Sequence, residues 1–128
     1  MVVANLTDII YAGNRRVQQF TVTDEDSVGS PAYDLTGLIV KYALARFSNG
    51  APLKDDPLLD FATTDGSPQV VITVAASGII EVTLLPADTS GLQPDDYYFE
   101  LEVFNAAGDE GVVVATGTLT VRTNVENA

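Results

Sequence analysis

The sequence predicts an all-β fold, an antiparallel β-sandwich of about seven to eight strands. Three observations lead to this prediction. Apolar and polar residues alternate with a period of two through most of the chain, and a helical period is nearly absent. The alternating runs are short, and clusters of turn-forming residues separate them at regular spacing. Strands with a single apolar face are typical of antiparallel sheets, which bury one side and expose the other.

Each predicted strand has a set of apolar residues on one face. The first run, Leu6–Tyr11, is interpreted as an eighth strand that breaks at Ala12-Gly13. The apolar sets of the others are, in order, Phe20 and Val22; Leu38, Val40, Tyr42 and Leu44; Leu59 and Phe61; Val70, Ile72 and Val74; Ile80, Val82 and Leu84; Tyr97, Phe99, Leu101 and Val103; and Val113, Ala115, Leu119 and Val121.

Turn signals define the connections and the domain limits. Pro86–Gly91 is the one helical candidate. We expect a single helical turn there, because Pro is favoured at the first position of a helix and Gly just after its last residue. The expected loops are 24–31, Ser48–Pro57, Asp65–Pro68 and Asn105–Asp109. These limits predict one sandwich domain over 14–122, an N-terminal arm or extra strand over 1–13, and a C-terminal tail over 123–128.

Composition excludes several kinds of chemistry. The chain has 128 residues, enough for one domain with a real core. It contains no Cys and no His. Ser-His and Cys-His nucleophiles, zinc sites built on thiolate or imidazole, and disulfides are therefore excluded. An enzyme would have to rely on carboxylates, Lys or Tyr, and we expect no enzymatic activity and no cofactor.

The charge is strongly acidic and unevenly distributed. The net charge is −12, which argues against nucleic acid and against anionic membranes as partners. Residues 1–64 carry 8 acids and 5 bases, whereas residues 65–128 carry 10 acids and one base, Arg122. The acidic charge is explained by solubility through self-repulsion. Alternatively, the acidic half is the solvent side and the first half is the side that meets a partner. No run is long enough to span a bilayer, and the N-terminus lacks the features of a signal peptide.

Several acidic residues are candidate ligands or catalysts. Asp24 and Asp26 together with Asp95 or Asp96 are the best candidates for calcium, provided that their loops share one end of the sandwich. None of them has the spacing of an EF-hand loop, and solvated turns are the favoured explanation. Glu100 and Glu102 lie about 7 Å apart along one strand face, as the strand rise requires, and could imitate a glycosidase pair. The predicted sandwich offers them no enclosing cleft.

Exposed apolar and basic residues are the candidate interaction residues. Tyr98 and Phe104 alternate to the face opposite the core and could stack on a sugar, or pack against another subunit. Arg15 and Arg16 could contact an acidic neighbour or pair with local acids. The edge strand at Leu6–Tyr11 could pair with another chain. The predicted interface residues are Leu6, Ile9, Tyr11, Arg15, Arg16, Tyr98, Phe104, Val112 and Val114.

The order of the short motifs is similar to that of a known family. The motifs are Asp34-Leu35-Thr36-Gly37 before a strand, Pro86–Leu92 as a helical turn, and Asp96–Val103 followed by Gly117–Val121 as the last hairpin. In this order they resemble the immunoglobulin-like domain at the N-terminus of bacteriophage baseplate upper proteins, a module that recurs in other small phage structural proteins. The resemblance covers roughly residues 14–122, and its motifs are largely structural.

The resemblance implies an immunoglobulin-like sandwich and a role in attachment within a virion. It brings no catalytic residues. Baseplate proteins of this kind usually continue into a stalk or receptor-binding part, whereas this chain ends at Ala128. We therefore expect a small accessory virion protein, such as a capsid-decorating protein or a neck, tail or baseplate adaptor. Its partners would be other virion proteins and further copies of itself, and a carbohydrate-binding module remains the alternative.

Overall fold

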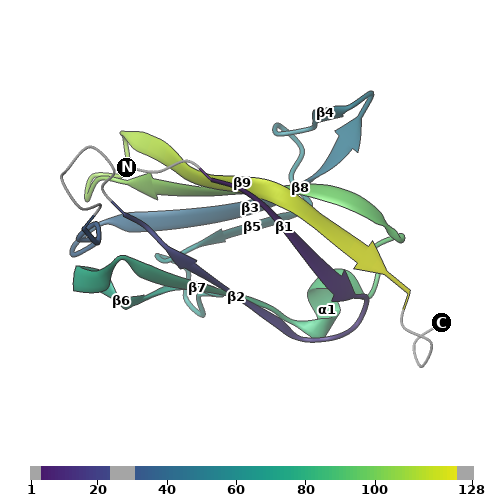
Figure 1. The fold of residues 1–128 in the computed structure, drawn as a ribbon, viewed down its shortest axis with the longest axis horizontal. Coiled ribbons are helices and arrows are strands. Elements are labelled where there is room, and N and C mark those ends of the chain that lie inside the picture. The colour runs from purple at the N-terminus through teal and green to yellow at the C-terminus, as the bar shows by residue number, and fades with distance from the viewer. Residues whose placement is uncertain (1–3, 24–30, 124–128) are drawn as a thin grey trace.

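The computed structural model describes residues 4–23 and 31–123, which form two β-sheets packed face to face (Figure 1). The large sheet has the order β1 (Ala4–Tyr11), β9 (Gly111–Arg122), β8 (Asp95–Phe104), β3 (Ile39–Ser48) and β4 (Ala51–Pro52), with β5 (Leu59–Ala62) also paired to β3. The small sheet has the order β2 (Arg16–Thr21), β7 (Ile79–Leu84) and β6 (Val70–Val74). The predicted all-β sandwich is confirmed.

The strand order is that of an immunoglobulin-like domain. The neighbours β9, β8, β3 and β4 correspond to strands G, F, C and C′ of a variable-type domain, and β2, β7 and β6 correspond to B, E and D. Strand β1 pairs with β9 in parallel, from Ala4 opposite Ala115 to Tyr11 opposite Arg122, whereas the other strand pairs are antiparallel. Residues 4–11 thus form an extra strand of the chain's own sheet, at its edge.

Aromatic rings fill the centre of the core between the sheets. Tyr42 stacks on Phe99 with ring centroids 5.9 Å apart and on Phe61 at 6.1 Å. Phe20 reaches Phe99 from the small sheet at 6.0 Å. The predicted apolar faces of β3, β7 and β8 point into this core, because alternate residues of a strand lie on opposite sides of the sheet.

A β-bulge in β9 changes the prediction for the last strand. Leu101 lies opposite Ala115, but the next residue, Glu102, lies opposite Val113. Val114 is therefore an extra residue, and it is only 4% exposed. The expectation that Val114 is exposed for contact was wrong, because the bulge reverses the inward and outward alternation at this point.

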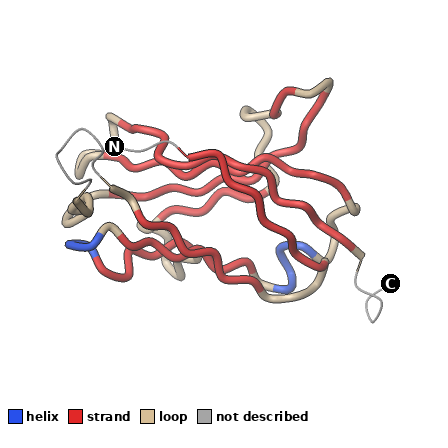
Figure 2. Tube along the Cα trace, in the orientation of Figure 1, coloured by secondary structure: helices blue, strands red, loops and turns tan. Residues whose placement is uncertain are grey.

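Two short elements were missed in the sequence. The segment Ser48–Pro57 was expected to be a connection, yet it contains β4 in a hairpin with β3. Asn49 and Gly50 form its turn with φ of 53° and 81°, as a two-residue hairpin turn of type I′ requires. A second helical turn, the 3₁₀ element η1 (Ala75–Ser77), ends at Gly78. Figure 2 shows both helical segments in blue.

The expected helical turn near Pro86 is present as α1 (Pro86–Thr89). The Asp88 carboxylate accepts hydrogen bonds from the Leu85 backbone N–H at 2.7 Å and from Gln69 Nε2 at 2.6 Å. The fully buried Thr89 accepts the Gly13 N–H on its Oγ1 at 3.1 Å. This helical turn therefore fixes the connection between β1 and β2. Neither helix in the described ranges has the length and apolar character that crossing a membrane requires.

Candidate interaction surfaces

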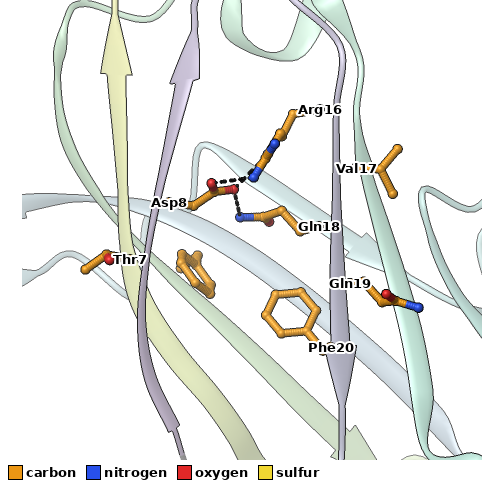
Figure 3. A pocket seen from close by; sticks show the side chains of 8 residues that line it. Thr7, Asp8, Arg16, Val17, Gln18, Gln19 and Phe20 are labelled. Atoms are coloured by element: carbon orange, nitrogen blue, oxygen red, sulfur yellow. Dashed lines mark hydrogen bonds and ion pairs between the residues drawn. The ribbon is translucent and has the colours of Figure 1, made fainter.

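A polar network links the two sheets where their edge strands β1 and β2 lie side by side (Figure 3). Arg16 donates two hydrogen bonds to the Asp8 carboxylate, from Nε at 3.1 Å and from Nη2 at 2.7 Å. Gln18 Nε2 donates a third to Asp8 at 3.1 Å. The amide oxygen of Gln18 accepts the hydroxyl of Tyr42 at 2.8 Å inside the core. The network thus runs from a surface ion pair to a buried phenol.

Burial, together with the charge of Asp8, favours the neutral form of Tyr42. Burial raises the pKa of the Tyr42 hydroxyl far above its ordinary value, and the negative charge of Asp8 raises it further. Gln18 is itself only 6% exposed, so each of its polar atoms needs the partner that it has here. Within residues 4–23 and 31–123 no buried side-chain nitrogen or oxygen is left without a hydrogen-bond partner.

The same network protects the edge of the large sheet. Strand β1 is an edge strand, as predicted, but Asp8 places a carboxylate on its inward side and also accepts the Ile9 backbone N–H at 2.9 Å. Inward charges of this kind deter pairing with another chain. A hollow of about 210 Å³ lies beside the network, with Phe20 and Phe99 among its lining residues. Arg16, expected at a partner contact, is engaged within its own chain.

A second surface lies on the outer side of the large sheet, around Tyr98. The Phe47 ring meets the Tyr98 ring edge-on, with centroids 6.2 Å apart and planes at 76°. Lys54 Nζ lies 5.2 Å from the centre of the Tyr98 ring. We call these three residues the aromatic–lysine cluster. Phe47 and Lys54 belong to the β3–β4 hairpin region, which extends away from the body of the sandwich in Figure 1.

Acidic and basic side chains continue along the same outer face. Lys41 Nζ lies 4.7 Å from the centre of the Phe104 ring. Glu100 raises the pKa of the Lys54 ammonium by its charge, with a further contribution from a hydrogen bond to Tyr98. Partial burial raises the pKa of the Glu102 carboxyl, and the nearby charge of Glu100 adds to the effect. The outer face therefore combines aromatic rings with charges of both signs.

The raised pKa of Glu102 makes a prediction for stability. A carboxyl whose pKa is higher in the folded state opposes folding once the pH rises above its ordinary value of 4.5, and has no such effect below it. We expect Glu102→Gln to raise the melting temperature by roughly 1–3 °C at neutral pH. The gain should disappear as the pH falls below the ordinary Glu pKa. Glu110→Gln, at an exposed turn position, serves as the control in the same thermal melts, and an equal gain there would contradict the explanation.

The calcium candidates are not brought together by the described residues. Asp24 and Asp26 lie outside those residues, and Thr23 and Ala32, which flank their loop, pair near the end of the sandwich where Gly78 lies. Asp95 and Asp96 begin β8 at the other end (Figure 1). Asp95 accepts the Asp96 N–H at 2.8 Å, and Asp96 accepts the Thr120 hydroxyl at 2.7 Å. The described part of the chain contains no cluster of three or more acidic residues that could hold a metal.

The other predicted interface residues are spread over several surfaces. Ile9, Tyr11 and Val112 are about half exposed, and Arg15 is exposed. Leu6 lies in β1 opposite Gly117. Tyr98 and Phe104 are half-buried on the outer face of β8. Phe47 and Leu53, which are 37% and 42% exposed at the β3–β4 hairpin, were not among the predicted interface residues. The dipeptide Asn49-Gly50 was the signal that could have identified this hairpin.

Comparison with known proteins gives similar solved structures at low identity. No protein family matches the sequence, and no curated protein matches it. Among solved structures, murine CRIg is similar with a TM-score of 0.42 and 13% identity, over 91% of this chain and 92% of that one. A PapD-like domain of human CEP192 has a TM-score of 0.30 and 11% identity over 93% of this chain and 84% of that one.

A third similar structure is a much larger protein. A family 123 glycoside hydrolase from Clostridium perfringens matches with a TM-score of 0.37 and 11% identity over 94% of this chain. The match covers only 23% of the hydrolase chain. At these identities the likeness of all three structures concerns the fold alone.

Proposed function

We propose that this chain is a non-enzymatic attachment module of a bacteriophage virion, acting through protein–protein contacts as a capsid-decorating protein or as a neck, tail or baseplate adaptor. The virion assignment derives from the motif order of residues 14–122, which resembles the module of phage baseplate proteins. The protein–protein assignment derives from the surface. Its partners would be other virion proteins and further copies of the chain.

The aromatic–lysine cluster is the observation that carries the proposal. Aromatic residues are enriched at the centre of protein interfaces, where a few of them supply most of the binding energy. Phe47 and Tyr98 already pack against each other, so little conformational entropy remains to be lost when a partner covers them. Lys54, Glu100 and Glu102 surround the rings and would orient a partner through charge complementarity.

Repetition on a particle would strengthen such a contact. A single small surface of this kind binds weakly, because association costs translational and rotational freedom. A symmetric shell holds many copies close together, and linked weak contacts then act with high overall avidity. The proposal therefore requires no large interface on the isolated chain.

Fractionation of phage particles tests this function. Particles from a lysate of the source culture are separated on a density gradient, and the protein is detected with an antibody. We expect it in the particle fractions, and we expect Tyr98→Ala to reduce the bound amount at least about tenfold, as loss of a central aromatic contact does. Val71→Ala, which changes an exposed valine on β6 of the other sheet, should remain bound. Recovery of the wild-type protein only in the soluble fractions would refute the virion assignment.

Carbohydrate binding is the alternative that the same residue allows. A sugar-stacking platform needs an accessible aromatic face, but Phe47 meets Tyr98 edge-on, so the two rings do not form one flat surface. Binding of the wild-type chain to a glycan array, abolished by Tyr98→Ala, would support this alternative over the attachment function.

A further inference from the structure

The turn of the β3–β4 hairpin holds two groups that can react with each other. Asn49-Gly50 is the one Asn-Gly pair in the sequence, and both of its residues are exposed. In the part of the chain that the structure describes, neither the Asn49 side-chain amide nor the Gly50 backbone N–H forms a hydrogen bond. No described atom outside the adjacent residues lies within 4 Å of the place where a Cβ of Gly50 would be, so the space around Gly50 is open.

The conformation of this turn lies close to the one that the reaction needs. The reaction closes a five-membered ring between the Gly50 nitrogen and Asn49 Cγ. An L residue in such a ring has a ψ of about −120°, which is the ψ at the first central position of a type II′ turn. The observed type I′ turn also has a positive φ at that position, where Asn49 has 53°. Rotation of the peptide group between Asn49 and Gly50 therefore gives the reactive geometry, and glycine tolerates the accompanying change in its own φ.

We propose that Asn49 is a site of spontaneous deamidation, with the Gly50 backbone nitrogen as the nucleophile. The nitrogen loses its proton to hydroxide and attacks Asn49 Cγ. The new C–N bond closes a succinimide, and the bond from Cγ to Nδ2 breaks with release of ammonia. Water then adds to one of the two ring carbonyl groups and opens the ring, to aspartate if the bond to Cγ breaks and to isoaspartate if the bond to the backbone carbonyl carbon breaks. Water is the only co-reactant, and either product adds one negative charge to a chain of net charge −12.

Asn105 lacks the conditions that Asn49 meets. Its Nδ2 donates a hydrogen bond to the Asp109 carboxylate at 2.8 Å, and its Oδ1 accepts the Asp109 backbone N–H at 3.1 Å. The residue that follows it is Ala106, whose Cβ atom obstructs the approach of the backbone nitrogen. Asn105 therefore serves as a reference inside the same molecule.

Isoaspartate at position 49 would change the hairpin. It lengthens the turn by one backbone atom, so that the two-residue loop no longer matches the twist of its strands. Strand β4 has only two residues, and a hairpin this short depends strongly on its turn. We therefore expect the Phe47 ring to lose its contact with the Tyr98 ring. A resulting loss of attachment would rest on the proposed function, whereas the deamidation does not depend on it.

Tryptic peptide mapping of the stored, folded chain tests the deamidation. Trypsin gives two informative fragments, 47–54 with Asn49 and 55–122 with Asn105. The chain is kept at neutral pH and at about two pH units higher, and a sample digested without storage gives the starting value. We expect fragment 47–54 to gain about 1 Da as an amide becomes a carboxyl group. The gain should be about tenfold faster for each pH unit, because the deprotonated nitrogen is the nucleophile. Fragment 55–122 should keep its mass.

A substitution and a free peptide are the controls. Asn49→Gln should leave fragment 47–54 unmodified, because glutamine would have to close a less favoured six-membered ring. A synthetic peptide with the sequence of residues 47–54 measures the reaction without the hairpin. We expect the folded chain to react within about tenfold of the rate of the peptide, because the turn already supplies the required φ. A greater retardation in the folded chain would overturn the proposal, and so would an equal mass gain in fragment 55–122.

Asn49→Asp separates the new charge from the change in the backbone. Freshly prepared, it carries the carboxylate on a normal backbone, and Asp-Gly also forms type I′ turns. NMR cross-relaxation between the ring protons of Phe47 and Tyr98 should persist in this variant and be lost in the purified isoaspartate form. Persistence in the isoaspartate form would refute the expected change in the hairpin.

Discussion

Gly78→Ala is expected to destabilise the fold by at least about 3 kcal/mol, because two separate costs add at this position. Gly78 has a φ of +68°, in the left-handed region that disfavours every residue with a Cβ atom. An alanine Cβ would also meet the backbone oxygen of Val22 in a severe overlap, and would lie 2.9 Å from the backbone oxygen of Tyr33.

The overlap cannot be relieved by a side-chain movement. Val22 donates its N–H to the Gly78 oxygen at 2.8 Å, and its own oxygen accepts the Tyr33 N–H at 3.0 Å. The three segments are thus held together through their backbones, and a shift of one disturbs the others. Only a residue without a Cβ atom allows η1, β7 and the end of β2 to meet here.

Gly50→Ala provides the control for this prediction. Gly50 also has a positive φ, +81°, but no atom lies within 4 Å of the place where a Cβ would be. Its substitution should lower the free energy of unfolding by roughly 1–2 kcal/mol, the cost of placing a residue with a Cβ atom in the left-handed conformation. Urea denaturation of both variants gives the free energies of unfolding. Equal losses of unfolding free energy in the two variants would show that the overlap with the Val22 backbone at position 78 adds nothing to the cost.

Gln18→Leu is expected to cost about 1–3 kcal/mol, since it leaves the buried hydroxyl of Tyr42 without an acceptor. Leucine is close to glutamine in size, so the loss arises from hydrogen bonding rather than from a cavity. The variant also removes one of the donors to Asp8. Asp8, Gln18 and Tyr42 lie on β1, β2 and β3. Loss of their hydrogen bonds should therefore weaken the packing between the sheets where β1 and β2 meet.

A double-mutant cycle separates the hydrogen bond from other effects. In Gln18→Leu with Tyr42→Phe both polar partners are removed, and we expect the double variant to be more stable than the sum of the two single losses predicts. Gln19→Leu is the matched control, because the neighbouring glutamine is exposed and should change stability by less than about 0.5 kcal/mol. Additive losses in the cycle would contradict direct coupling between Gln18 and Tyr42.

Local sequence patterns were sufficient for most of the strands. The alternation in Tyr97–Val103 and in Ile80–Leu84 places the same residues in the core as the structure does, because a strand can bury only one face against the other sheet. The helical turn at Pro86 was also predictable, since Pro favours the start of a helix. The exposure of Ile9, Tyr11 and Val112 followed from the same patterns.

The errors arose where a partner strand decides the geometry. The bulge at Val114 depends on the register between β8 and β9, which the sequence of β9 alone does not reveal. The parallel pairing of β1 with β9 joins residues more than a hundred positions apart. The Asp8 network was missed for the same reason, because an acid in a short predicted strand looks like a solvated residue until Arg16 and Gln18 are placed beside it.

The sequence by itself determined the fold class, the absence of His and Cys chemistry and most of the core of this protein. These properties depend on residue type and on a period of two, which are local. The tertiary structure alone decided which side chains share a surface. It joined Phe47 and Tyr98 into one cluster and brought Arg16 and Gln18 to the Asp8 carboxylate. Surfaces of this kind form only when strands distant in sequence become neighbours in a sheet.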